Sequence, residues 1–122
     1  MRLTCAILFA KDIHRLTAFY ERLGLEAIEA TRATNWVEFA AGSTTFALHA
    51  IPDEIAAGIE IADPPVLREE TPIKLVFSVD DVDAECARLA AAGIQLTRRP
   101  WGVAEGADPE GNIFQVSRAA NG

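Results

Sequence analysis

An internal repeat limits this chain to folds made of two similar halves. Residues 5–29 and residues 74–97 have the same order of parts: an apolar run, an aspartate, an amphipathic stretch, a glycine and a second apolar run. The two aspartates, Asp12 and Asp81, are 69 residues apart. A repeat of this kind predicts two similar supersecondary units that share a core.

Each aspartate is expected to begin a helix, because its carboxylate can accept hydrogen bonds from the free amides of the first turn. Gly24 and Gly93, also 69 residues apart, are placed where a left-handed residue can end that helix at little cost. Apolar residues recur between these signals at helical spacing. They are Ile13, Leu16, Phe19, Tyr20 and Leu23 in the first copy, and Val82, Cys86 and Leu89 in the second.

Strand signals precede and follow each helix, so each copy is predicted to be a βαβββ module. The predicted strands are 5–10, 25–31, 36–40 and 45–49 in the first module, and 74–79, 94–98, 101–104 and 113–117 in the second. We therefore expect one α+β domain over residues 1–122, in which the tandem modules form a curved mixed sheet with the helices on its outer face. Module one spans about 3–50, an acidic linker with a short helix near 53–57 spans 51–72, and module two spans about 73–119.

The faces of these strands differ in chemistry, because successive side chains of a strand point to opposite sides. One face is wholly apolar and suits packing against the helices. The other combines apolar and polar side chains, as the lining of a ligand pocket does. The predicted ligand-binding residues are Phe9, Trp36, Glu38, His49, Lys74 and Gln115, with Trp101 either stacking on a ligand or capping the sheet. A half-solvated sheet face with no ligand is the alternative.

Composition narrows the class of partner. The formal charge of −7 disfavours nucleic acid and anionic lipid as partners. No apolar run approaches the roughly 18 residues of a membrane span, and the N-terminal residues lack the apolar core of a signal peptide. Cys5 and Cys86 are too few for a disulfide framework, so a reduced protein in the cytoplasm is expected.

The repeat, the segment FYERLGL and the terminal segment DPEGNIFQV resemble the vicinal oxygen chelate superfamily over about residues 3–118. That superfamily includes glyoxalase I, extradiol dioxygenases, fosfomycin-resistance enzymes and bleomycin-binding proteins, so the resemblance identifies a fold better than an activity. In metal-dependent members, ligands come from the first and last strands of each module. The resemblance places those four positions at Cys5, Ala47, Lys74 and Gln115.

These four side chains are a poor donor set for a divalent cation. Ala47 offers no donor, Lys74 carries an ammonium that repels a cation, and Gln115 replaces a carboxylate with a neutral amide. We therefore predict neither a bound metal nor another cofactor. The alternative is a displaced site made by Cys5, Glu38 and His49.

Three functions remain open from the sequence. The first is a metal-free protein that binds a small organic molecule, as the bleomycin-binding branch does. The second is a lyase or isomerase that uses the displaced metal site, or His49 or Glu38 as a general base. The third is a subunit-assembly module without a ligand.

Two further expectations concern partners. A planar or partly aromatic ligand with an acceptor or anionic group would suit Lys74, whose charge must be answered by the ligand, by Glu38 or by water. A homodimer is expected because two open βαβββ units leave strand edges that proteins usually cover.

Overall fold

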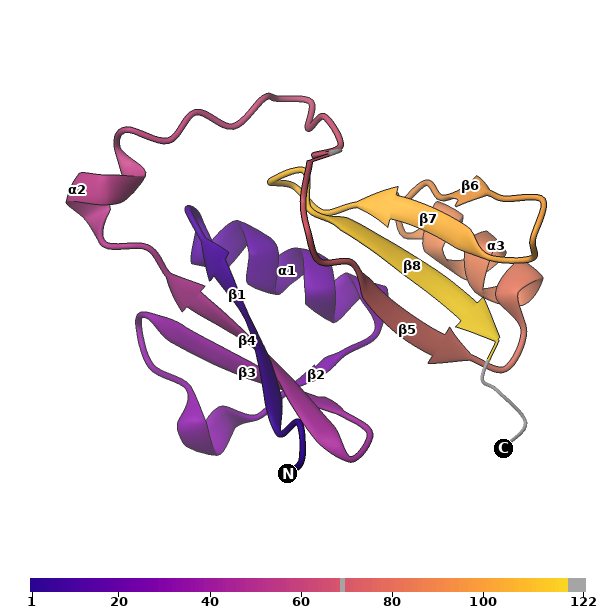
Figure 1. Ribbon diagram of the computed structural model, residues 1–122, viewed down its shortest axis with the longest axis horizontal. Coiled ribbons are helices and arrows are strands. Elements are labelled where there is room, and N and C mark those ends of the chain that lie inside the picture. The colour runs from indigo at the N-terminus through magenta and orange to yellow at the C-terminus, as the bar shows by residue number, and fades with distance from the viewer. Residues whose placement is uncertain (69, 119–122) are drawn as a thin grey trace. The chain divides into compact units, whose positions relative to one another are not determined.

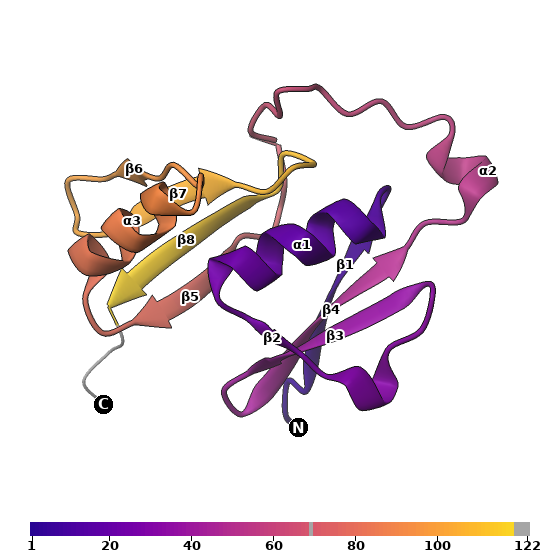
Figure 2. The same ribbon diagram turned by 180° about the vertical axis from the view of Figure 1, so that it is seen from behind.

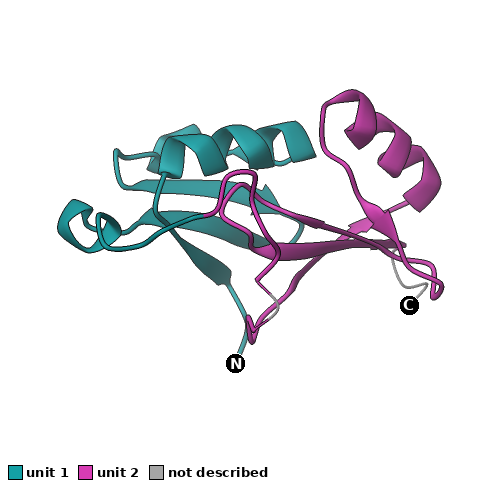
Figure 3. Ribbon diagram, turned by 90° about the horizontal axis from the view of Figure 1, so that it is seen from above, with its two compact units in different colours: residues 1–61 teal, residues 62–122 magenta. Residues whose placement is uncertain are grey.

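The computed structural model describes residues 1–68 and 70–118, and the chain divides into two compact units, residues 1–61 and 62–122 (Figure 3). Each unit contains one four-stranded mixed sheet and one principal helix (Figures 1 and 2). The predicted α+β fold of two tandem βαβββ modules is thereby confirmed. In the described part of the chain, no helix is both long and apolar enough to cross a membrane.

The first unit begins with a parallel strand pair. Its elements are β1 (Cys5–Ala10), α1 (Ile13–Leu23), β2 (Glu26–Ala27), a 3-10 turn η1 (Glu29–Thr31), β3 (Trp36–Ala41), β4 (Thr44–Ala50) and α2 (Asp53–Ala56). The strand order is β1-β4-β3-β2, with β1 parallel to β4 and the other pairs antiparallel. Helix α1 lies along one face of this sheet and contacts β3 and β4 (Figure 2). The opposite face of the sheet is therefore free of that helix.

The second unit repeats this arrangement. Its elements are β5 (Leu75–Val79), α3 (Val82–Ala91), β6 (Thr97–Arg98), β7 (Ala104–Ala107) and β8 (Ile113–Arg118). The strand order is β5-β8-β7-β6, again with one parallel pair, β5 and β8, at the start. Helix α3 packs on β8, so each module has one helix-covered sheet face.

The helix signals act as the sequence predicts. The side chain of Asp12 accepts a hydrogen bond from the Arg15 amide at 3.1 Å, and that of Asp81 accepts one from the Ala84 amide at 3.1 Å. Gly24 ends α1 with φ of 116°, a left-handed conformation that costs little only for glycine. The apolar stripe of α1 is buried against its sheet, and in α3 Val82 and Leu89 are buried while Cys86 is half-buried. The most deeply buried large side chains include Leu16, Tyr20, Phe39 and Leu48 in the first unit and Leu89, Phe114 and Val116 in the second.

Three predicted strands are shorter or displaced. The strand predicted at 25–31 pairs only through Glu26–Ala27, because the chain then turns into the 3-10 helix. The strand predicted at 94–98 is limited to Thr97–Arg98. The strand predicted at 101–104 begins at Ala104, because Gly102 (φ 91°) closes a turn whose amide bonds the Arg99 carbonyl at 3.1 Å. The short helix predicted at 53–57 is present as Asp53–Ala56.

Candidate functional site

The helix-free face of the first unit carries a row of three flat side chains. Strand pairing places Phe9 of β1, His49 of β4 and Trp36 of β3 side by side. The Phe9 and His49 rings are 5.7 Å apart between centroids, and the His49 and Trp36 rings are 5.8 Å apart with an edge-to-face tilt. These distances lie in the range of favourable aromatic pairs. We call these three residues the aromatic row.

A carboxylate lies beside the aromatic row. Glu38 is two residues along β3 from Trp36, so both side chains point to the same face. The Trp36 indole Nε1 donates a hydrogen bond to Glu38 Oε1 at 3.2 Å. Within residues 1–68 and 70–118, no basic nitrogen lies within 4.0 Å of this carboxylate.

The surface at this row is open and largely apolar. Phe9 is 62% exposed, and Ile7, which shares its face, is 51% exposed. His49, Trp36 and Glu38 are half-buried. Ligand pockets are lined by a similar mixture of apolar and aromatic side chains with few polar groups.

The structure separates two of the three residues of the displaced metal site expected as an alternative. Cys5 pairs with Thr45, whereas His49 pairs with Phe9, four residues further along β1. Four residues of extended strand separate Cα atoms by about 13 Å, so Cys5 cannot share one ion with His49. Among the residues that the structure describes, no three histidine, cysteine, aspartate or glutamate side chains come together as a metal site.

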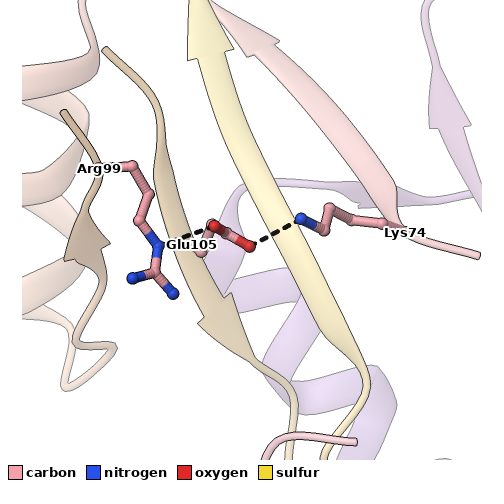
Figure 4. A network of polar contacts seen from close by, with 3 residues as sticks. All are labelled: Lys74, Arg99 and Glu105. Carbon is pink, nitrogen blue, oxygen red and sulfur yellow. Dashed lines mark hydrogen bonds and ion pairs between the residues drawn. The ribbon is translucent and has the colours of Figure 1, made fainter. Parts of the chain in front are cut away.

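The corresponding face of the second unit holds an ion-pair network, shown in Figure 4. The Glu105 carboxylate lies between two cations: Oε2 accepts from Lys74 Nζ at 2.8 Å, and Oε1 accepts from Arg99 Nε at 2.8 Å. The Glu105 side chain is only 6% exposed, while those of Lys74 and Arg99 are 39% and 37% exposed. The partner of Lys74 is therefore Glu105, not Glu38 as one reading of the sequence had it.

The ion-pair network lowers the pKa of the Glu105 carboxyl group. The hydrogen bond from Lys74 lowers the pKa of Glu105 below its ordinary value, and the hydrogen bond from Arg99 lowers it further. Burial acts in the opposite direction, because a charged carboxylate loses hydration. The net direction is downward, so Glu105 is held in its ionised form.

Sequence reasoning missed Glu105, although the repeat contains the signal. Glu38 pairs with Ala47 across the β3–β4 ladder, and Glu105 pairs with Gln115 across the β7–β8 ladder. The two glutamates are thus equivalent positions of the two modules, 67 residues apart. The predicted strand at 101–104 ended before Glu105, and that error concealed the equivalence.

The remaining predicted residues of the second unit are placed differently. Gln115 lies on β8 between Val76 and Glu105, in the same cross-strand row. Trp101 lies in the turn between β6 and β7 and is 68% exposed. A role for either residue in ligand binding stays a prediction.

The donor set at the four family metal positions does not fit a divalent cation. Ala47 is fully buried and presents a methyl group. The Lys74 ammonium is bound to Glu105, and Gln115 is a neutral amide. Only Cys5 is a good ligand for a divalent metal, and one ligand does not hold such an ion in a protein site.

Comparison with solved structures shows similar folds over nearly the whole chain. A glyoxalase/bleomycin resistance protein/dioxygenase family enzyme from Burkholderia phytofirmans PsJN is 24% identical, with a TM-score of 0.73 and coverage of 98% of this chain and 100% of that one. A bleomycin-binding protein complexed with bleomycin is 19% identical, with a TM-score of 0.66 and coverage of 98% and 99%. A lactoylglutathione lyase from Agrobacterium tumefaciens is 25% identical, with a TM-score of 0.68 and coverage of 97% and 93%.

Comparison at the level of sequence gives one match and one negative result. No curated protein sequence matches the chain. The family model described as Glyoxalase/Bleomycin resistance protein/Dioxygenase superfamily matches residues 2–116, which include both modules. The resemblance read from the repeat is thereby confirmed, and the chain belongs to the Glyoxalase/Bleomycin resistance protein/Dioxygenase superfamily.

Proposed function

We propose that this chain is a metal-free small-molecule-binding protein of the glyoxalase/bleomycin-resistance type. The observation that carries this proposal is the aromatic row, which presents exposed flat surface beside the Glu38 carboxylate. A ligand that covers the 62%-exposed Phe9 ring would remove apolar surface from water. The similarity to a bleomycin-binding protein supports a binding function on this fold.

The metal-free part of the proposal rests on the chemistry of the side chains. Two of the four family positions, Ala47 and Lys74, offer no lone pair to a metal, since the lysine is ion-paired as an ammonium. Elemental analysis of tag-free protein is expected to find far less than one Zn, Fe, Ni or Mn per chain. A stoichiometric amount of any of these metals would contradict the proposal.

A thermal-shift screen of aromatic compounds of positive, neutral and negative charge tests the binding function, because a ligand that binds only the folded state raises Tm. The variant Phe9→Ala is expected to weaken binding of any hit, since it removes an exposed ring of the aromatic row. Ile55→Ala is the matched control, because Ile55 is similarly exposed, at 57%, but lies in α2. If Phe9→Ala and Ile55→Ala bind a hit equally well, the ligand does not bind at this face.

A lyase or isomerase activity is the second candidate, and the placement of His49 favours it. Its imidazole is half-buried on the open face, histidine is the most frequent general acid or base in enzymes, and Glu38 lies on the neighbouring strand. The 25% identity to a lactoylglutathione lyase adds weight. Lactoylglutathione incubated with the protein without added metal tests this candidate. Turnover that His49→Gln abolishes would support His49 as a base, and no turnover would exclude lactoylglutathione as a substrate of this protein.

We also propose that the protein forms a homodimer. Strands β1 and β2 are the edges of the first sheet, and β5 and β6 are those of the second. Exposed strand edges invite pairing, and two-fold pairing is the commonest way to cover them. Light scattering is expected to give twice the chain mass of 13.2 kDa. A monomer mass at every protein concentration measured would contradict the dimer.

A cytoplasmic location completes the proposal. Cys5 and Cys86 are both free thiols and half-buried, which suits a reducing compartment. The acidic surface, with a formal charge of −7, gives no reason to expect nucleic acid as a partner. Cell fractionation followed by detection of the protein tests the location, and recovery outside the cytoplasm would contradict it.

A further inference from the structure

Glu38 carries a negative charge that no cation of the described chain neutralises. Its Oε1 accepts from the neutral indole of Trp36, and none of the ion pairs of the described residues includes it. The side chain is half-buried. A partly desolvated carboxylate gains more from a cationic partner than a fully hydrated one does. The aromatic row therefore lies beside a carboxylate that no cation of the described residues neutralises.

Lys74 gives no reason to expect an anionic ligand. A partly buried ammonium would need an acidic group from outside only if the protein supplied none. Glu105 supplies this group at 2.8 Å and holds Arg99 through its other oxygen. Lys74 is accordingly satisfied within its own unit, and it no longer requires an acidic group from outside.

The aromatic row itself favours positive charge. The face of an aromatic ring carries negative electrostatic potential, so it attracts cations, and the indole of tryptophan does so most strongly. Phe9 and Trp36 flank His49 at ring distances below 6 Å. A flat cation can stack against Trp36 while its charge remains near Glu38, which accepts the indole hydrogen bond.

We propose that the open face of the first unit, formed by Phe9, Trp36, His49 and Glu38, binds a planar organic cation. This inference rests on the proposed binding function and deepens it by giving the class of ligand. Flat apolar surface accounts for the planar part of the ligand, and the Glu38 carboxylate accounts for its charge. Charge complementarity between ligand and site sets the preference for a cation over an anion.

Two probes of the same shape and opposite charge test the sign. N-methylquinolinium and 2-naphthoate each contain two fused six-membered rings, so their stacking surfaces are closely matched. Equilibrium dialysis with the intact protein measures both affinities without relying on tryptophan quenching. We expect the cation to bind roughly tenfold or more tightly than the anion at low salt, and the difference to shrink as salt screens the charge.

The variant Glu38→Gln tests the residue. The glutamine amide oxygen can still accept the Trp36 indole hydrogen bond, so the substitution removes charge and little else. We expect roughly tenfold weaker binding of N-methylquinolinium and little change for 2-naphthoate. Glu21→Gln is the control, because it removes the same charge from the exposed side of α1. It should leave both affinities within twofold.

The possible outcomes distinguish a wrong ligand class from a wrong binding function. If 2-naphthoate binds as tightly as the cation, or if Glu38→Gln and Glu21→Gln behave alike, the inference of a cation is wrong while the binding function stands. If neither probe nor any screened compound binds, the binding function itself is wrong. If Phe9→Ala converts a dimer to a monomer and no probe binds, the face is an interface between two copies, which also overturns the inference.

Discussion

The two modules place different residues at equivalent positions on the helix-covered face of the sheet. On the helix-covered face of the first module, Phe39 of β3 stacks on Phe46 of β4, with ring centroids 5.8 Å apart. At the equivalent pair in the second module, Gly106 of β7 lies opposite Phe114 of β8. A β-carbon built on Gly106 would lie 2.6 Å from Leu96 Cδ2 and 2.9 Å from Phe114 Cζ. In the first module, two facing rings fill this cross-strand space. In the second, the side chains of Leu96 and Phe114 pack against Gly106.

The open faces of the modules differ just as sharply. Glu38 and Glu105 are equivalent in the repeat, yet the Glu38 carboxylate accepts from an indole, whereas the Glu105 carboxylate binds two cations. The first face combines aromatic surface with a carboxylate that has no cationic partner among the described residues, and the charges of the second face pair with one another. The two modules therefore place side chains at equivalent positions, whereas the individual residues decide which charges on the open face are paired.

The largest expected effect comes from breaking the ring pair of the first module. Phe39 is fully buried, and Phe39→Ala removes its contacts with Phe46 and Tyr20. We expect the free energy of unfolding to fall by about 3–5 kcal/mol, since the site cannot collapse around the missing ring. Urea denaturation followed by circular dichroism measures the change. Phe9→Ala, at the exposed aromatic row, is the control and should cost less than about 1 kcal/mol. Similar losses for both variants would contradict the assignment of core and open face.

The next effect concerns the ion-pair network. Glu105→Gln removes the charge that neutralises Lys74 and Arg99, and it leaves both cations beside a buried amide. We expect a loss of about 1–3 kcal/mol, below the cost of breaking a fully buried pair, because both cations are more than a third exposed to screening solvent. Glu85→Gln provides the matched control, since Glu85 pairs with Arg88 on the surface of α3. A loss no larger than the control's would show that the network contributes nothing.

The same carboxylate predicts a dependence of stability on pH. The pKa of Glu105 is lowered in the folded protein, so the unfolded chain binds a proton more readily than the folded one. The stabilisation is therefore present above the unfolded pKa, about 4.3, and is lost as pH falls through the lower folded pKa. Urea midpoints of the wild type and Glu105→Gln, measured from pH 7 to pH 3, should converge at the acid end. A constant difference across this range would contradict the shift.

Most of the fold could be predicted because it depends on local sequence signals that occur in both modules. The capping aspartates, the helix-ending glycines and the alternating strands recur at nearly constant spacing, so each module supports the other. The strand at β7 was misplaced because its sequence, Ala104–Ala107, lacks the β-branched and aromatic residues that mark strands. Its pairing with β8 is a tertiary effect that local propensity does not encode.

The candidate site was predicted less completely for the same reason. Alternation placed Phe9, Trp36, Glu38 and His49 on one face, and the structure brings them together as neighbours. The partner of Lys74 depended on the position of β7, so the ion pair could not be foreseen once that strand was misplaced. Errors in strand register change which charges meet, because adjacent positions point to opposite faces.

The smallest expected effect is the stability change at the first module's glutamate. Glu38→Gln retains the acceptor for the Trp36 indole and removes a charge that has no cationic partner among the described residues. The free energy of unfolding should therefore change by less than about 0.5 kcal/mol, in contrast to the loss at the equivalent Glu105. Urea denaturation of the two variants side by side measures the difference. A loss at Glu38 as large as that at Glu105 would mean that the folded protein already neutralises Glu38, and that its open face has no free charge to offer a ligand.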